Sequence, residues 1–349
     1  MIPDSCSDRN LWRSLLHAAT SVVLTVGAGA LAWRFIPTTW VWAPAWLIYM
    51  LVCGTFATGV WVVAHECGHR AFCNGTKLQD AIGFTLHTAL LVPYFSWQRS
   101  HAIHHAKTNH LTEGETHVPK ADGTAKASRA ERTGQRLGRG PHAVVTLFGR
   151  LGFGWPAYLF GGATGATGRG VTNHFWPRKP FSPVIFPGRW ARKAFISAAG
   201  VLAMHILLLW WAFAMSGLTT VLLVYGGPLI IVNCWLVAYT WLQHTDVDIP
   251  HYDGDDWSFV RGAFCTVDRP YGSVVDFLHH RIGSTHVAHH IDAKIPHYRA
   301  LAATNAIAAA YPDLYRFDPT PVPKALWRVA RDCHVVRKTA DGWRFKATA

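Results

Sequence analysis

Long apolar runs with almost no charged residues set the pattern of this chain; Arg34, near the end of the first run, is the exception. Four of them are 21 to 25 residues long, which is enough to cross about 30 Å of hydrocarbon at about 1.5 Å per residue in a helix. Very short turns at residues 36–39 and 216–218 join the runs in pairs. The pattern predicts an all-α, polytopic membrane protein with four transmembrane helices, at about residues 15–35, 40–64, 196–216 and 219–242.

Two lesser apolar stretches lie outside these runs. Residues 81–95 are too few to cross a membrane, and residues 144–162 are interrupted by Arg150, Pro156 and several glycines. Both stretches are predicted to lie at the membrane interface. The basic, glycine-rich stretch 123–140 is expected to form turns and coil. Because no internal repeat or separable soluble segment is visible, the whole chain, 1–349, is predicted to be a single membrane-embedded domain with a cytosolic helical cap.

The distribution of lysine and arginine orients the predicted helices. Basic residues crowd the N-terminal tail, the segment 70–193 and the part after residue 261, and they nearly vanish from the two hairpin turns. By the positive-inside rule, these charged segments face the cytosol. The formal net charge is +13. Since no Lys/Arg-rich helix or RNA-binding signature accompanies this charge, we assign it to contact with lipid headgroups and expect no nucleic-acid partner.

Histidine is the most unusual part of the composition, with 21 residues. Eight of them fall into three motifs, one with two histidines four residues apart and two with the pattern H-x-x-H-H. Positions i, i+3 and i+4 share one face of an α-helix, so each motif is expected to present its nitrogens toward one point. Each motif follows a predicted membrane or interfacial helix at its cytosolic end. The predicted metal ligands are His65, His69, His101, His104, His105, His286, His289 and His290.

The first motif alone also permits a different interpretation. His65-Glu66-Cys67-Gly68-His69 matches the zinc-protease signature, in which Glu66 is the general base. A membrane zinc hydrolase would leave both H-x-x-H-H motifs unexplained, and a structural zinc ion needs only four ligands. Eight imidazoles suit two ions, of iron or copper, that each keep an open position. In that arrangement Glu66 is an outer hydrogen-bond acceptor that orients a ligand histidine.

Further side chains are candidates for the same site. His244 follows the fourth predicted span at its cytosolic end and is a candidate ninth ligand. His280 lies six residues before the third motif and is expected to support the ligands from outside. We expect no catalytic side chain beyond the metal ligands. Phe95, Trp97 and Phe277 are candidate walls of an apolar substrate tunnel.

The motifs and their surroundings resemble the membrane fatty acid desaturases, and among them the acyl-lipid omega-6 (delta-12, oleate) enzymes. The likeness extends over nearly the whole chain. The sequence departs from the omega-6 pattern at Arg70, where those enzymes usually carry a second histidine, and at Ala102 and Ile103, where they carry two arginines. Ile282-Gly283 leans toward the omega-3 relatives. The segments that carry the resemblance best are WVVAHECGH (61–69), LLVPYFSW (90–97) and THVAHH (285–290).

This resemblance implies a reaction and its partners. It implies a non-haem di-iron centre bound by the eight motif histidines, O2 as co-substrate, and a cytochrome b5-type or ferredoxin electron donor. The implied reaction places a cis double bond in a membrane-lipid-linked acyl chain, converting phospholipid-linked oleate to linoleate in the endoplasmic reticulum membrane. The alternatives are an omega-3 (delta-15) desaturase, a hydroxylase, acetylenase or conjugase of the same family, the zinc hydrolase, and a metal-dependent receptor or carrier without turnover.

Overall fold

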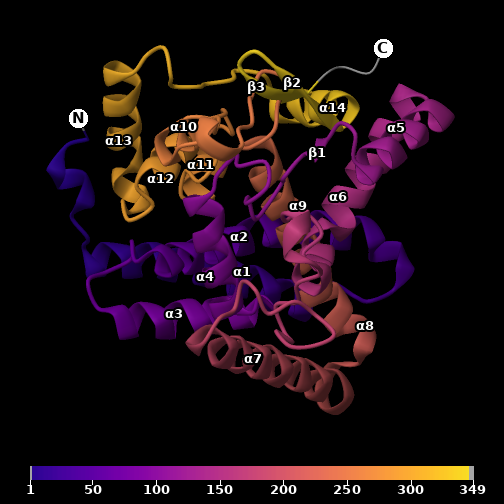
Figure 1. Cartoon of the computed structure of the whole chain (residues 1–349). Helices are drawn as coiled ribbons and strands as arrows, with labels where there is room; N and C mark the ends of the chain where they lie inside the picture. The colour runs from indigo at the N-terminus through magenta and orange to yellow at the C-terminus, as the bar shows by residue number, and fades with distance from the viewer. Residues whose placement is uncertain (1, 346–349) are drawn as a thin grey trace.

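The computed structural model describes residues 2–345 and is mostly helical (Figure 1). Each of the four runs predicted to cross the membrane forms a helical segment that is long and apolar enough to do so. The turns between them are short, as predicted, so the helices form two hairpins. The principal helices of these hairpins are α1 (Leu11–Phe35), α2 (Ala43–His69), α7 (Arg189–Trp211, extended by a π-helical turn to Ser216) and α9 (Gly227–Leu242).

The return helix of the second hairpin begins irregularly. α8 (Leu218–Val221) passes into a π-helical turn, Leu222–Gly226, before α9 starts. Pro228 lies in the first turn of α9 and has no N–H to donate to the carbonyl of Val224. The Tyr49 hydroxyl donates to that carbonyl instead (2.6 Å). A side chain of α2 therefore satisfies the backbone group that the proline leaves free.

α2 is the central helix of the membrane region. It packs against both α1 and α9, and most of its residues from Cys53 onward are buried. Gly54 allows α9 to approach closely, because a Cβ at this position would lie 2.4 Å from the Cβ of Ile231. The outer faces of α1 and α7 instead expose large apolar side chains such as Val23 and Leu202. Such faces are suited to contact with lipid tails.

One stretch that was expected to be interrupted is a continuous helix. α6 spans Arg139–Gly161 and includes Pro156 without a break. It is long and apolar enough to cross a membrane, so the described residues contain five such helical segments where the sequence predicted four. Glycine and proline lower the intrinsic stability of a helix, but α6 packs against α9 and α14. Tertiary packing thus overrides the local signal that suggested an interruption.

The other stretch assigned to the interface is divided into two helices. α3 (Thr76–Ala89) ends at a turn in which Leu91 has a left-handed backbone (φ 56°), and α4 (Tyr94–Ala106) begins after Pro93. Both helices pack against α2 and α7. The turn therefore brings α4, which carries the second histidine motif, back to the end of α2.

The basic stretch expected to be coil contains a helix, α5 (Ala125–Leu137). The Thr124 side chain caps it by accepting a hydrogen bond from the backbone N–H of Ala127 (3.2 Å). Ala127 and Ala130 are buried against Val335. The expectation of coil was wrong because these two alanines have a partner surface that is distant in sequence.

A cap, residues 244–345, packs against α2, α6 and α9 through its helices α11 and α14, and its yellow and orange ribbons lie opposite α7 in Figure 1. It includes two strands of a small sheet, in which β1 pairs with β2 in parallel and β2 pairs with β3 antiparallel. The fold is thus helical with one minor sheet. The strands are β1 (Lys120–Ala121), β2 (Val335–Thr339) and β3 (Gly342–Phe345). The cap helices are α10 (Phe259–Ala263), α11 (Ser273–Leu278), α12 (His286–Ile291), α13 (His297–Ala310) and α14 (Val322–Asp332). Short 3₁₀ turns lie at Asp4–Ser7, Trp40–Trp42, Thr167–Arg169 and Gly254–Asp256.

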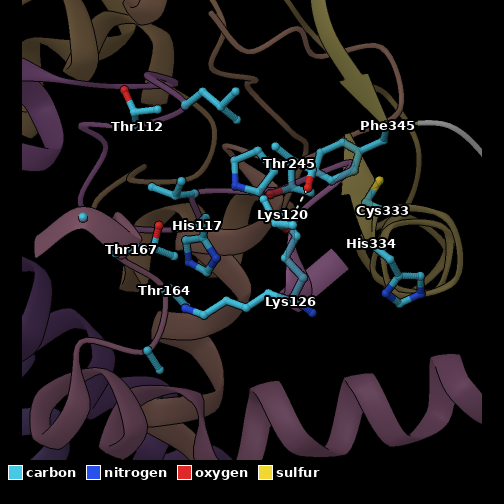
Figure 2. Close-up of a pocket in the computed structure, with 18 of the residues that line it drawn as sticks. Thr112, His117, Lys120, Lys126, Thr164, Thr167, Thr245, Cys333, His334 and Phe345 are labelled. Carbon is cyan, nitrogen blue, oxygen red and sulfur yellow. Dashed lines mark hydrogen bonds between the residues drawn. The ribbon is translucent and has the colours of Figure 1, made fainter. Parts of the chain in front are cut away.

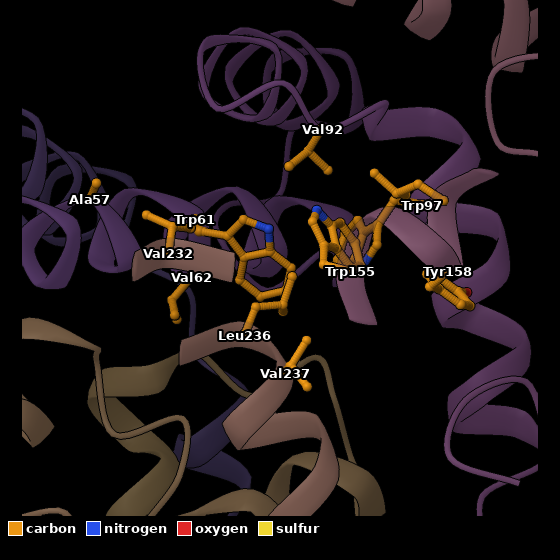
Figure 3. Close-up of a cluster of buried hydrophobic side chains, with 11 residues drawn as sticks. Ala57, Trp61, Val62, Val92, Trp97, Trp155, Tyr158, Val232, Leu236 and Val237 are labelled. Carbon is orange, nitrogen blue, oxygen red and sulfur yellow. The ribbon is translucent and has the colours of Figure 1, made fainter. Parts of the chain in front are cut away.

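A buried cluster of aromatic and aliphatic side chains joins α2, α4, α6 and α9 (Figure 3). Trp61 of α2 and Trp97 of α4 meet edge to face, with their ring centroids 5.4 Å apart. Trp61 also stacks near His65, and Trp97 stacks on His101 with a centroid distance of 4.6 Å. This core therefore fixes the positions of histidines in the first two motifs.

Candidate metal centre

All three histidine motifs lie on helices, as the sequence predicted. The first occupies the last turn of α2, the second the C-terminal half of α4, and the third forms most of the short helix α12. His244 lies two residues beyond the end of α9. The structure brings these four segments together, so the eight motif histidines and His244 form one cluster of nine.

Five of the nine histidines make up the first group. Their ligand nitrogens all lie within 4.8 Å of one another. The Nε2 atom of His65 is 2.9 Å from that of His101 and 3.2 Å from that of His69, and Nε2 of His105 is 3.2 Å from that of His101. His289 completes the group, and its buried Nε2 has no hydrogen-bond partner among the described residues.

The remaining four histidines make up the second group, which is centred on His244. Its Nε2 is 3.1 Å from Nε2 of His104 and 3.0 Å from Nε2 of His286. The Nε2 atoms of His286 and His290 are 3.1 Å apart. The two groups adjoin, since the rings of His105 and His290 stack with centroids 4.1 Å apart.

This partition corrects an expectation drawn from spacing. Each H-x-x-H-H motif was expected to direct its three nitrogens to one point, but each is shared between the groups. In the second motif, His101 and His105 join the first group while His104 joins the second. In the third motif, His289 joins the first group, and His286 and His290 join the second.

Hydrogen bonds on the far side of the rings determine which nitrogen carries the proton. Nδ1 of His286 lies 3.2 Å from the carbonyl oxygen of Ile282, which can only accept, so this Nδ1 must carry the hydrogen. The Thr108 hydroxyl donates to the His104 carbonyl (2.9 Å) and therefore accepts from Nδ1–H of His290 (2.9 Å). In both neutral rings Nε2 is then a bare acceptor. Two acceptors 3.1 Å apart cannot hydrogen-bond to each other, but they can share a bound cation.

Burial keeps these imidazoles neutral. It lowers the pKa of His104 to about 3, with a further contribution from repulsion by neighbouring histidines. It lowers the pKa of His286 to about 4, although the hydrogen bond to Ile282 opposes the shift. At neutral pH both rings are therefore unprotonated, which is the form that binds a metal ion.

The cluster fits two metal ions. It offers one group of five imidazole nitrogens and one group of four. Imidazole nitrogen is a ligand that iron, copper and zinc all accept. The outer acceptors on Thr108 and Ile282 are the partners that orient ligand histidines in metal sites. Metal ions in this centre would bind to the Nε2 atoms of the nine histidines. Among them, the buried Nε2 of His289 has no hydrogen-bond partner within the described residues.

Glu66 and His280 lie beside the cluster, and both contact His297. Both carboxylate oxygens of Glu66 accept hydrogen bonds from His297, one from the backbone N–H (2.5 Å) and one from Nδ1–H (2.6 Å). The histidine that Glu66 orients is thus not one of the predicted ligands. His280 lies against His297 and His17 and hydrogen-bonds to Ser21 (3.0 Å). With both oxygens engaged, Glu66 is not placed as the free base that the zinc-protease interpretation requires.

Sequence reasoning missed the residues that hold the ligands from outside. Thr108 lies one helical turn beyond His104, so its spacing was a usable signal. Thr116 is not predictable in this way, because it lies in a loop and reaches back to Nδ1 of His104 (2.6 Å). Arg70, which stands where the omega-6 enzymes usually carry a histidine, ends α2 in a left-handed conformation and pairs with Asp80 (2.8 Å).

A narrow cavity of about 50 Å³ adjoins the first group. His101 lies on one wall, and the others are mainly apolar or aromatic, including Trp61, Trp97 and Trp155. Trp97 was predicted as a tunnel wall and lines this cavity. Phe95 is partly buried in a different cluster, and Phe277 is exposed.

Replacing Thr116 by valine is expected to weaken metal binding by about 10- to 100-fold, because His104 loses the acceptor that holds its ring. Metal affinity would be measured by competition with a chelator, followed by elemental analysis of the purified protein. Thr133→Val is the matched control, since its hydroxyl donates to the carbonyl of Arg129 on the surface of α5. Equal affinities in the two variants would contradict the role given to Thr116.

Comparison with known proteins identifies the family. A sequence model described as fatty acid desaturase matches residues 40–320. The chain belongs to the fatty acid desaturase family. The matched segment contains all three histidine motifs and His244. Fatty acid desaturases are oxidoreductases, so the enzyme class and the family predicted from the sequence are confirmed.

Relatives extend the likeness over most of this desaturase. It is 41% identical over 336 residues to an oleoyl-12-hydroxylase of Ricinus communis, covering 95% of this chain and 84% of the relative. It is 40% identical over 345 residues to a delta(12) fatty acid desaturase of Calendula officinalis, covering 97% and 86%. It is 45% identical over 286 residues to an omega-6 fatty acid desaturase, endoplasmic reticulum isozyme 2, of Glycine max, covering 82% and 72%.

Proposed function

We propose that this chain is an O2-dependent, di-iron acyl-lipid desaturase that introduces a cis double bond at the delta-12 position of an oleoyl chain. The observation that supports this most is the convergence of nine histidines, as groups of five and four, beside an apolar cavity. The names of the desaturases from Calendula and Glycine favour the delta-12 position. The acyl chain is carried on a membrane lipid, and electrons come from a cytochrome b5-type protein or a ferredoxin.

The protein's own residues have three tasks in this reaction. The first group (His65, His69, His101, His105, His289) would hold one iron ion, and the second group (His104, His244, His286, His290) would hold the other. Bound iron supplies the activation of O2 that removal of two hydrogens from an unactivated chain requires. The walls formed by Trp61, Trp97 and Trp155 hold two adjacent methylenes of the substrate near the irons and exclude water.

We further propose an endoplasmic reticulum location with the metal centre on the cytosolic side. The positive-inside rule supports this orientation, because the motif-bearing segments are rich in lysine and arginine and the short hairpin turns are not. The cytosolic side is also where a soluble or tail-anchored electron donor could reach the centre. The name of the Glycine relative supports the organelle.

The proposal is tested in a yeast that makes only monounsaturated fatty acids. Expression of the chain is expected to produce an 18:2 fatty acid with a new delta-12 bond, detected by mass spectrometry of the methyl esters. His286→Ala is expected to abolish this product, because it removes a nitrogen of the second group. Product formation at the wild-type level by His286→Ala would overturn the di-iron assignment.

The same experiment separates the alternatives within the family. The 41% identity to an oleoyl-12-hydroxylase makes hydroxylation the second candidate, and it would yield a 12-hydroxy product from the same oleate. An omega-3 desaturase would convert only supplied linoleate. A zinc hydrolase would give none of these products and would lose its activity in Glu66→Ala.

A further inference from the structure

Several histidines lie outside the metal centre, and a shared cavity does not by itself make them a metal site. His117 and His334, for example, line a separate cavity of about 570 Å³, where Figure 2 shows them on separate walls. Neither belongs to a set of three converging ligand atoms within the described residues. His17, His280 and His297 do form such a set, the third histidine group, with one nitrogen of each within 4.8 Å of the others.

The members of the third histidine group come from distant parts of the chain. His17 lies on α1, His280 lies two residues beyond the end of α11, and His297 begins α13. The ring centroid of His297 lies 4.4 Å from that of His17 and 4.5 Å from that of His280. The group therefore joins the first membrane helix to the cap.

Glu66 prepares His297 to bind a metal ion. Nδ1 of His297 donates its hydrogen to a carboxylate oxygen of Glu66 (2.6 Å), so Nε2 of the neutral ring is a bare acceptor. This Nε2 is buried and has no hydrogen-bond partner within the described residues. A carboxylate on the far nitrogen is a usual partner of a histidine that binds zinc, because it fixes the ring and makes the ligand nitrogen more basic.

His280 offers a second unpaired nitrogen to the same group. Its Nε2 hydrogen-bonds to the hydroxyl of Ser21 (3.0 Å), while its buried Nδ1 has no partner among residues 2–345. Burial lowers the pKa of His280 well below its ordinary value, and repulsion from His297 and His17 lowers it further. The ring is therefore neutral at neutral pH, which is the form that binds a metal ion.

Space for one more ligand lies beside the third histidine group. A cavity of about 20 Å³ is lined by Glu66, His280 and His297, and it has room for about one water molecule. Three imidazoles and a water are a tetrahedral ligand set that zinc accepts, whereas magnesium, calcium and manganese prefer oxygen ligands. The same cavity reaches His65 and His69, but these two belong to a separate set of converging nitrogens.

We propose that His17, His280 and His297 bind a Zn²⁺ ion that is separate from the two ions of the metal centre and that fastens α1 to the cap. The bonds to Glu66 and Ser21 orient two of the three ligands before the ion arrives. The bound ion in turn fixes His297, and with it Glu66 at the end of α2. The site uses no acyl chain, O2 or electron donor, so it goes beyond the proposed reaction and does not rest on it.

The test uses the purified full-length protein in detergent, loaded with iron and then titrated with Zn²⁺. The wild-type chain is expected to bind one zinc ion without releasing iron, as measured by elemental analysis after gel filtration. Zinc is also expected to raise the midpoint of thermal unfolding, because the site exists only in the folded chain. Zinc that displaces iron ion for ion would lie in the metal centre, and this result would overturn the proposal.

A variant of the third histidine group gives the second comparison. His17 is only partly buried, so His17→Gln removes one ligand with little risk to folding. Its affinity for the added zinc, measured by competition with a chelator, is expected to fall by more than about 100-fold, since losing even an outer partner of a ligand costs about 10- to 100-fold. Equal zinc affinity in His17→Gln and the wild-type chain would also overturn the proposal.

The matched control is His205→Gln, which is expected to bind zinc as the wild-type chain does. His205 lies on another membrane helix, α7, and hydrogen-bonds to the Val201 carbonyl of its own helix (2.8 Å). The zinc difference between His17→Gln and this control does not depend on product formation or on which metal fills the centre. Failure of this proposal therefore remains distinguishable from failure of the yeast experiment.

Discussion

Replacing His244 by alanine is expected to lower desaturation by more than about 100-fold, since losing even an outer partner of a metal ligand costs about 10- to 100-fold. His244 is not part of any of the three motifs. Its Nε2 nevertheless lies 3.1 Å from that of His104 and 3.0 Å from that of His286. It therefore joins the second motif to the third, and its removal leaves the second group with three histidines.

The measurement is the yield of 18:2 product in yeast together with the iron content of the purified protein. Loss of about half of the iron along with the product is the expected result, because the first group remains intact. His205→Ala is the control, since His205 lies on α7 and hydrogen-bonds to its own helix at the Val201 carbonyl (2.8 Å). Normal iron content and product yield in His244→Ala would show that the second group does not need this histidine.

Replacing Arg269 by methionine is expected to destabilise the fold by about 3–5 kcal/mol, the usual cost of removing one partner from a buried ion pair. The Arg269 side chain is fully buried. It pairs with Asp246 (2.7 Å) and with Asp318, and its Nε donates to the carbonyl of Leu242 (3.2 Å). Both Leu242 and Asp246 lie within two residues of His244. The same substitution should therefore loosen the segment that carries the proposed ninth ligand.

Thermal unfolding of the purified protein in detergent would measure this effect, with iron content as a second readout. Arg331→Met is the control, because Arg331 lies on the surface and pairs with Asp332 (2.9 Å), where an ion pair contributes little. If Arg269→Met and the control have the same midpoint of thermal unfolding, the ion pairs of Arg328 with Asp246 and with Asp318 are sufficient to stabilise this region.

The histidine motifs could be predicted from the sequence because the geometry within each motif depends only on neighbouring residues. A helix turns about 100° per residue, so the spacing of His65 and His69 alone places both rings on one face. The membrane helices could be predicted for the same reason, since length and hydropathy are properties of a continuous segment. The interruption expected in residues 144–162 does not occur, because packing against α9 and α14 stabilises α6 as a continuous helix.

The assignment of each histidine to a group could not be predicted from spacing. His104 and His105 are neighbours in sequence, yet they belong to different groups, because consecutive positions on a helix point about 100° apart. Which direction faces which partner depends on where α9 and α12 lie relative to α4. Thr116 is a further example, since a loop brings its hydroxyl to His104 with no periodic signal.

The sequence by itself determined the membrane helices, the three motifs and the family, because each of these depends on residues that are close together along the chain. Only the tertiary structure decided that nine histidines divide into groups of five and four, and that Glu66 accepts hydrogen bonds from His297. These features join side chains that are distant in sequence. Their positions follow from the packing of α2, α4, α6, α9 and the cap. Packing between segments that are distant in sequence produces no local sequence pattern from which it could be predicted.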